Sequence, residues 1–192
     1  MKKNYEMDMC SGPILGKLLT FTIPLIFSGI LQLLFNAADV IVVGRFAGSQ
    51  SLAAVGSTTA LINLMINIFI GLSVGVNVIV ARYYGAKREK DVQDTIHTAM
   101  ALSIVSGLFL IILGQLLSRP MLELMGTPDD VIDKSTIYMR IIFIGMPANM
   151  IYNFGSAILR AVGDTKRPLY FLTAAGVINV VLNLFFVIMF RM

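Results

Sequence analysis

One acidic residue stands inside an otherwise uncharged, apolar stretch of this sequence. Asp39 follows 21 uncharged residues, 18–38, and precedes the apolar run from Val40 to Gly44. An ionisable side chain within a membrane-spanning helix is costly and by default marks a functional site for an ion or a proton. The alternative is that Asp39 lies among the lipid headgroups and merely ends the helix. Counting from Lys17 at about 1.5 Å per residue places it in the outer half of the membrane.

Amide side chains accompany Asp39 at helical spacing. Gln32 and Asn36 precede it by seven and three residues, so the three side chains share one helical face. Asn179 and Asn183 stand four residues apart and also share a face. Such polar stripes suit a water-filled cavity that holds a cation or a proton. Hydrogen bonds between helices, worth about 1 kcal/mol or less each, would use the same residue types.

Two prolines interrupt apolar segments that carry polar residues. Pro24 precedes the stripe in the first segment, and Pro147 precedes Asn153 in the fourth. A proline inside a helix leaves a backbone carbonyl unpaired and weakens the helix there. Interrupted helices whose freed backbone lines a cavity recur in transporters. We therefore expect helix kinks at both prolines, and we expect Asn153 to line the cavity together with Gln32 and Asn36.

Residues for other kinds of chemistry are scarce. One His and one Cys, far apart in the sequence, give no metal cluster. The sequence has no Walker A motif, so ATP hydrolysis would need another chain. An intramembrane aspartyl protease would need two apposed acids, and Asp39 is the one clear candidate. The residue inventory therefore favours transport over catalysis, and we expect a protein that is not an enzyme.

The composition indicates which elements must position these residues. Of the 192 residues, 57% are hydrophobic and only 14% are charged, against roughly 25% in an ordinary soluble domain. So few charges cannot cover a soluble core, and the excess apolar surface must face lipid. The net charge of +4 could suit nucleic acid, but no basic run is interleaved with aromatic residues. We therefore expect the lipid bilayer, and no nucleic acid, as a partner.

Five apolar segments are long enough to span a bilayer, which takes about 20 residues each. We predict an all-α, polytopic membrane protein with spans at about 18–44, 52–81, 95–118, 134–159 and 168–190. If the N-terminus is inside, the cytoplasmic segments carry ten of the fifteen Lys and Arg residues. Basic residues concentrate in cytoplasmic loops. The N-terminus is therefore predicted to be cytoplasmic.

Two local patterns predict how particular helices begin and pack. Thr127 is expected to be the N-cap of the fourth helix, with Pro128 at its first helical position. Gly71 and Gly75 form a GxxxG pattern, which predicts a close packing face on the second helix.

Three stretches of the sequence together resemble the MATE (multidrug and toxic compound extrusion) transporters. They are ADVIVVGR at 38–45, ARYYGA at 81–86 and LRAVGDTKRP at 159–168, in the order of the family. The resemblance implies cation-coupled antiport that exports drugs or organic cations across the cytoplasmic (inner) membrane. The coupling ion would be sodium or a proton, with no other cofactor. The alternatives are a lipid-linked precursor flippase of the same superfamily and a non-transporting membrane assembly or regulatory subunit.

The resemblance also implies roles for individual residues. The acid that ends the polar stripe of the first helix, here Asp39, belongs to a cation site in the N-terminal lobe. Its usual partners on the fifth helix are an Asn and, four residues later, an Asp; this sequence has Asn179 and Asn183 there. A single carboxylate with neutral oxygens could bind sodium, or Asp39 alone could carry a proton. No other metal is expected.

The length of the chain limits what it can do by itself. A family member has about twelve spans in two six-helix lobes, with the substrate cavity between them. The five predicted spans form most of one such lobe. We therefore expect a small-molecule substrate to be handled together with a second lobe, which the rest of a longer protein or a partner chain would supply.

Overall fold

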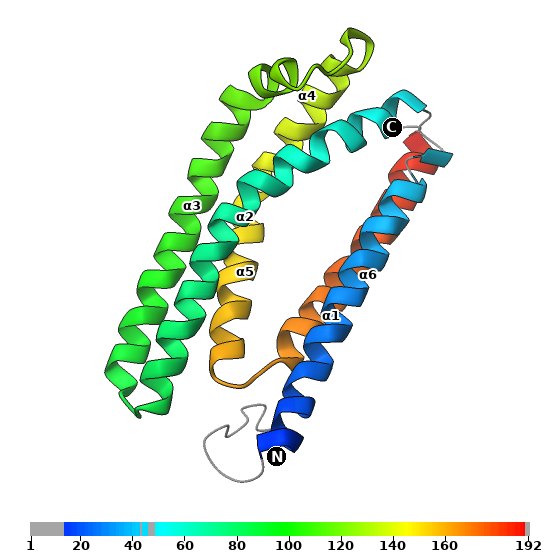
Figure 1. Ribbon diagram of the computed structural model, residues 1–192. Helices are drawn as coiled ribbons and strands as arrows, with labels where there is room; N and C mark the ends of the chain where they lie inside the picture. The colour runs from blue at the N-terminus through cyan, green and yellow to red at the C-terminus, as the bar shows by residue number, and fades with distance from the viewer. Residues whose placement is uncertain (1–13, 43, 46–48, 191–192) are drawn as a thin grey trace.

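The computed structural model describes residues 14–42, 44–45 and 49–190, and every regular element in these ranges is a helix. In chain order the helices are α1 (Ile14–Val42), α2 (Ser49–Gly85), α3 (Glu89–Leu124), α4 (Asp129–Ile144), α5 (Met146–Ala161) and α6 (Lys166–Phe190) (Figure 1). Helices α1, α2, α3 and α6 are each long and apolar enough to cross a membrane, and α4 with α5 qualifies as one bent span. The prediction of an all-α, polytopic membrane protein is confirmed.

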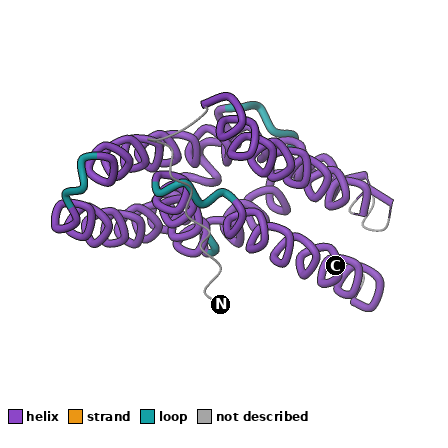
Figure 2. The backbone as a smooth tube through the Cα atoms, turned by 90° about the horizontal axis from the view of Figure 1, so that it is seen from below, coloured by secondary structure: helices purple, strands orange, loops and turns teal. Residues whose placement is uncertain are grey.

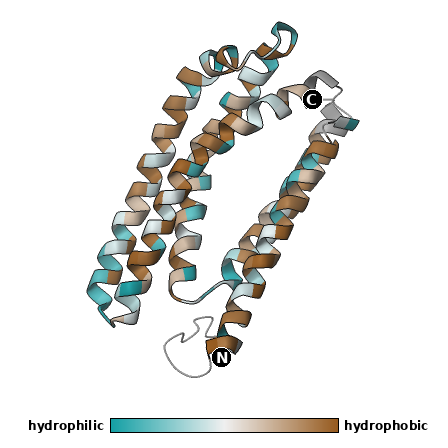
Figure 3. Cartoon of the chain, viewed as in Figure 1, coloured by the Kyte–Doolittle hydropathy of each residue, from teal (hydrophilic) through white to brown (hydrophobic). Residues whose placement is uncertain are grey.

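The helices extend beyond the apolar segments because polar residues continue them at both ends. Helix α3 begins at Glu89, where Glu89 and Asp91 stabilise the positive end of its dipole. At its other end it continues through Pro120 to Leu124. Figure 3 shows hydrophilic residues concentrated at the ends of the helices in the α2–α5 part of the molecule.

The fourth apolar segment forms two helices instead of one. Helices α4 and α5 meet at Gly145 with a bend of 48°. Pro147 stands in the first turn of α5, where its missing N–H costs nothing because no acceptor precedes it in that helix. Pro24, in contrast, lies buried within α1, which the structure describes as a single helix.

Two glycines allow α3 to lie directly against this bend. A Cβ atom added to Gly107 would lie 2.4 Å from Cα of Pro147, and one added to Gly114 would lie 2.0 Å from the ring of Phe143. Both distances are far inside van der Waals contact. The seven-residue spacing puts both glycines on one face of α3, so the helix can approach the backbone of the bend on either side of Gly145.

The packing face predicted from the GxxxG pattern is wrong for the described part of the chain. Gly71 and Gly75 are exposed, and a Cβ atom added to either would meet nothing within 4 Å. Helix α2 instead turns Ser73, Val76 and Val80 toward its neighbours. A sequence pattern of small residues marks a surface that can pack, but it does not say which face of the helix the fold uses.

The start of α4 also differs from the prediction. Pro128 occupies the N-cap position, and no side chain caps the helix. Thr127 instead completes the end of α3, because its N–H donates to the carbonyl of Leu122 while Gly126, at φ 69°, donates to Glu123. This pair of bonds is a Schellman motif. The backbone N–H of Thr127 thus takes part in the end of α3.

The six helices form two packed groups. Helices α2–α5, here called the four-helix group, surround a core that includes Leu110, Met139, Phe143 and Phe154. Helices α1 and α6, here called the helix pair, pack along each other, and α6 makes a small contact with α5. Figures 1 and 2 show the helix pair beside the four-helix group from two directions.

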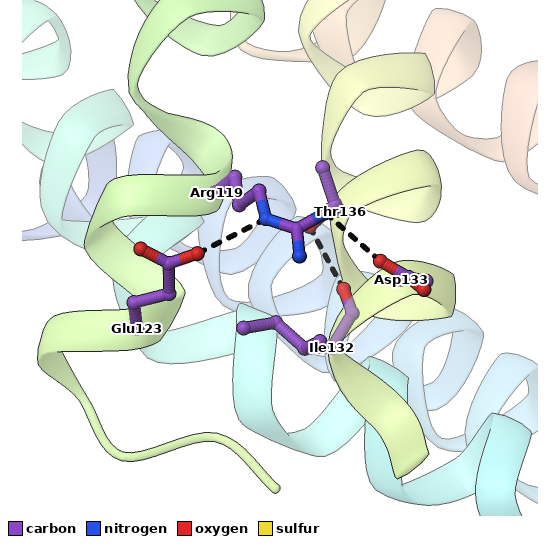
Figure 4. A network of polar contacts seen from close by, with 5 residues as sticks. All are labelled: Arg119, Glu123, Ile132, Asp133 and Thr136. Carbon is purple, nitrogen blue, oxygen red and sulfur yellow. Dashed lines mark hydrogen bonds and ion pairs between the residues drawn. The ribbon is translucent and has the colours of Figure 1, made fainter. Parts of the chain in front are cut away.

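Ion pairs join the end of α3 to the start of α4. Arg119 donates through Nε to Glu123 and through Nη1 to Asp133, each at 3.0 Å (Figure 4). All three side chains are more than half exposed. Exposed ion pairs contribute roughly 0–1 kcal/mol, so these bonds orient the connection and add little to stability.

Candidate functional site

Close packing within the helix pair decides which of its polar side chains meet. A Cβ atom added to Gly176 would lie 1.9 Å from the ring of Phe35, so the glycine lets this ring lie on the α6 backbone. Asp39 follows Phe35 by four residues and Asn183 follows Gly176 by seven, and each returns to the same helical face. Because α1 and α6 run in the same direction (Figure 1), the two polar side chains are brought together.

Asp39 and Asn183 form a direct hydrogen bond. Nδ2 of Asn183 donates to Oδ1 of Asp39 at 2.5 Å, and both residues are half-buried. Among the described residues, no Lys or Arg forms an ion pair with Asp39. The site is therefore a partly desolvated carboxylate with an amide donor and no counter-charge. A bound cation or proton would neutralise a charge that the membrane environment disfavours.

Helix α4 contributes a residue that the sequence analysis missed. The half-buried phenol of Tyr138 interacts electrostatically with Asp39. One turn earlier on α4, Ser135 shares a hydrogen bond of 3.2 Å with Ser57 of α2. The available signal was a tyrosine within an apolar segment, since such a ring combines an apolar body with a polar tip. Its proximity to the end of α1 is a property of the tertiary fold.

The other predicted residues do not contact Asp39 in this structure. Gln32, Asn36 and Asn179 are exposed, and none of them makes a hydrogen bond within the described ranges. Asn153 lies on α5, where it donates to the backbone and side-chain oxygens of Asn149 at 2.9 and 2.8 Å. The structure thus brings together Asp39 and Asn183 of the predicted set, and the cavity-lining role of the others stays a prediction.

The arrangement can hold either kind of coupling ion in chemical terms. Hard cations take oxygen ligands, and both a carboxylate and an amide carbonyl can supply them. Asn183 presents its nitrogen to Asp39 here, and rotation of the carboxamide would present the oxygen instead. Proton binding would need the carboxylate alone, with Asn183 as its hydrogen-bonding neighbour.

Comparison with known proteins places this site in a wider context. A model of the MatE family matches residues 24–185. The probable multidrug resistance protein YoeA of Bacillus subtilis is 35% identical over 162 residues, which are 84% of this chain and 35% of that protein. The FAD transporter of Shewanella oneidensis is 28% identical over 91% of this chain and 38% of its own length.

Solved structures show the same helix arrangement. A multidrug resistance MATE family transporter of the MOP superfamily, in an outward-facing conformation, matches with a TM-score of 0.83 and 27% identity. The match covers 89% of this chain and 38% of that one. The first two curated relatives are likewise covered over 35% and 42% of their lengths. The chain thus spans about two-fifths of the length of these proteins.

Proposed function

The chain belongs to the MATE family of transporters, and from this premise we propose that it is the N-terminal part of a cation-coupled antiporter. Sodium ions or protons would enter the cell while a small molecule is exported. The chain is a multi-pass membrane protein, and its location in the cytoplasmic (inner) membrane is part of the proposal. Family members are transporters, so no enzymatic step is assigned.

The observation that carries this proposal is the hydrogen bond between Asp39 and Asn183. It joins a carboxylate without a described counter-charge to a second helix of the same pair. An ion that neutralises Asp39 would compete with the amide of Asn183 for the carboxylate oxygen. Binding would therefore change the contact between α1 and α6, and this change is what could couple ion entry to movement of the helices.

The proposed substrates are drug-like organic cations. The multidrug resistance proteins among the relatives support this class. A second candidate is an anionic nucleotide, which the similarity to the FAD transporter favours. Since the chain spans about two-fifths of its relatives, a second lobe of the same protein or a partner chain would complete the substrate cavity.

Transport by the complete protein in proteoliposomes tests the proposal. Efflux of ethidium, driven by an imposed sodium or pH gradient, is compared between the wild type, Asp39→Asn and Asp94→Asn. Asp94 is exposed near the start of α3 and has no ion pair within the described ranges, so its variant is the matched control.

We expect Asp39→Asn to lower gradient-driven efflux by about tenfold or more, since the variant lacks the carboxylate charge that would bind the ion, and interactions with a charged group are worth about 1.5–3 kcal/mol. Asp94→Asn should transport like the wild type. Unchanged efflux by Asp39→Asn at equal protein level would remove Asp39 from the mechanism. The gradient that drives efflux identifies the coupling ion, and FAD in place of ethidium tests the second substrate class.

A further inference from the structure

The connection between α5 and α6 gathers basic side chains in one tight corner. Helix α5 ends in a Schellman motif, in which Gly163 (φ 87°) donates to the carbonyl of Arg160 and Asp164 donates to that of Leu159. Helix α6 begins two residues later, at Lys166. Residues 159–168, here called the α5–α6 corner, therefore hold Arg160, at the end of α5, and Lys166 and Arg167, at the start of α6.

The one acid of this corner is already engaged. Asp164 is buried, and its Oδ1 accepts the backbone N–H groups of Lys166 and Arg167 at 3.1 Å each. Its Oδ2 lies 3.2 Å from Nε of Arg167. Asp164 thus caps the start of α6 and compensates one guanidinium. Two positive charges of the corner, those of Arg160 and Lys166, have no acid paired with them in the described chain.

Of these two charges, that of Arg160 is the less exposed to solvent. It is half-buried and interacts electrostatically with Tyr152, whose hydroxyl donates to the carbonyl of Pro168 at 3.3 Å. A partly desolvated charge is unfavourable unless an opposite charge is supplied. Lys166 is exposed and adds a second positive charge close to it in the chain. The corner is therefore arranged for an anion that the described chain does not contain.

The position of the corner in the membrane selects the kind of anion. Helix α6 is a candidate span from Lys166 onward, so the corner lies at the membrane surface. Tyr170 and Phe171, both more than half exposed, follow one turn into the apolar region, where aromatic side chains accompany lipid headgroups. A guanidinium contacts phosphate oxygens through two parallel N–H donors. Basic pockets on the cytoplasmic side of membrane helices bind anionic headgroups.

We infer that the α5–α6 corner, which the predicted orientation puts on the cytoplasmic side, binds the headgroup phosphate of an anionic phospholipid of that leaflet. Arg160 makes the bidentate contact and Lys166 supplies the second charge. Arg167 stays with Asp164 and keeps the corner in shape. The inference does not depend on which ion or substrate the complete transporter carries, because it concerns the surface of the protein and not the Asp39 site.

Thermal unfolding of the complete, detergent-purified protein tests this site. Phosphatidylglycerol should raise the unfolding midpoint, whereas an equal amount of phosphatidylcholine should not. Arg160→Gln should weaken the apparent affinity for phosphatidylglycerol about fivefold or more, the effect of one basic residue at an anionic surface. Arg160→Lys should weaken it less. Lys90→Gln, which removes an exposed charge at the start of α3 on the same side of the membrane, should leave it unchanged.

Two further measurements make the result decisive. Inorganic phosphate should not reproduce the effect of the lipid, and an equal shift with phosphate alone would mean a free-anion site and overturn the lipid assignment. Because Arg160→Gln could weaken the fold itself, photoactivatable phosphatidylglycerol is also applied to the wild type. It should label peptides from 152–168 in preference to those from 82–98. Even labelling of both regions, or equal lipid affinity of Arg160→Gln and wild type, would refute the site.

Discussion

Asp39 receives its side-chain hydrogen bond from Asn183 and not from Asn179, although both amides lie on α6 and either could suit an ion site. The difference comes from the register that Phe35 and Gly176 impose on the helix pair. A shift of one turn along α6 would exchange the two amides. Two side chains of the same chemistry therefore differ in whether they contact Asp39, because their packing neighbours differ. A comparison of matched variants can test this.

Replacing Asn183 by Leu should tighten the binding of the coupling ion to Asp39. The variant removes the amide that donates to the half-buried carboxylate and competes with the ion, and hydrogen bonds to charged groups are worth about 1.5–3 kcal/mol. The sodium or proton concentration needed for half-maximal transport should fall about tenfold or more. Asn179→Leu, the control on the exposed amide, should stay within about twofold of the wild type. Equal effects of both variants would mean that the register of the helix pair is not the one described.

Within the site, the sequence pointed to some residues and missed others for a physical reason. Asp39 could be identified because a charge in an apolar segment is conspicuous whatever the fold. Asn183 could be grouped with Asn179 by spacing, but choosing between them needs the packing at Gly176. Tyr138 had no signal that related it to Asp39, since their electrostatic interaction depends on the tertiary arrangement of α1 and α4.

At the scale of the elements, α3 supports the bend between α4 and α5. Gly107 and Gly114 allow α3 to pack closely against the bend on either side of Gly145. A Cβ atom added to Gly107 would meet backbone atoms of Pro147. Backbone cannot rotate away as a side-chain end can. The bend is therefore fixed by packing from a neighbouring helix as well as by the proline itself.

Gly107→Ala should destabilise the protein, because its methyl group would lie 2.4 Å from Cα of Pro147. Overpacking of this kind costs about 1–3 kcal/mol and occasionally more. The midpoint of thermal unfolding in detergent should fall by several degrees. Gly71→Ala, on an open face of α2, is the control and should be neutral or slightly stabilising, since alanine favours helix more than glycine does. A neutral Gly107→Ala would show that α3 does not hold the bend.

The elements themselves were largely predictable, whereas their ends and breaks were not. Apolar length alone located the helices, because a membrane span must satisfy its own backbone. The extension of α3 to Leu124 and the start of α4 depend on a Schellman motif at Gly126, which is decided by a few local hydrogen bonds. The bend at Gly145 lies two residues before Pro147, the residue from which a kink was predicted.

For the whole molecule, the important boundary lies between the helix pair and the four-helix group. Asp39 belongs to the pair, while Tyr138, with which it interacts, belongs to the group. Within the described residues, the apolar core lies in the group, and α1 and α6 keep most of their apolar side chains exposed. An ion at Asp39 would therefore act within the helix pair, at a carboxylate that interacts electrostatically with the four-helix group. The direction from which the ion arrives depends on the orientation in the membrane.

The predicted orientation can be measured with single cysteines in the complete protein. Cys10, which precedes the described residues, is first replaced by Ser, and Lys90→Cys or Asp130→Cys is then introduced singly. Lys90 lies in the first turn of α3 and Asp130 lies just beyond its other end. The 36 residues of α3 span about 54 Å at about 1.5 Å per residue, so the two positions must lie on opposite sides of the membrane. A membrane-impermeant maleimide should label Asp130→Cys in intact cells and Lys90→Cys only after permeabilisation. The reverse pattern would place Asp39 toward the cytoplasm, and it would move the α5–α6 corner to the outer leaflet, where its lipid partner would have to be sought instead.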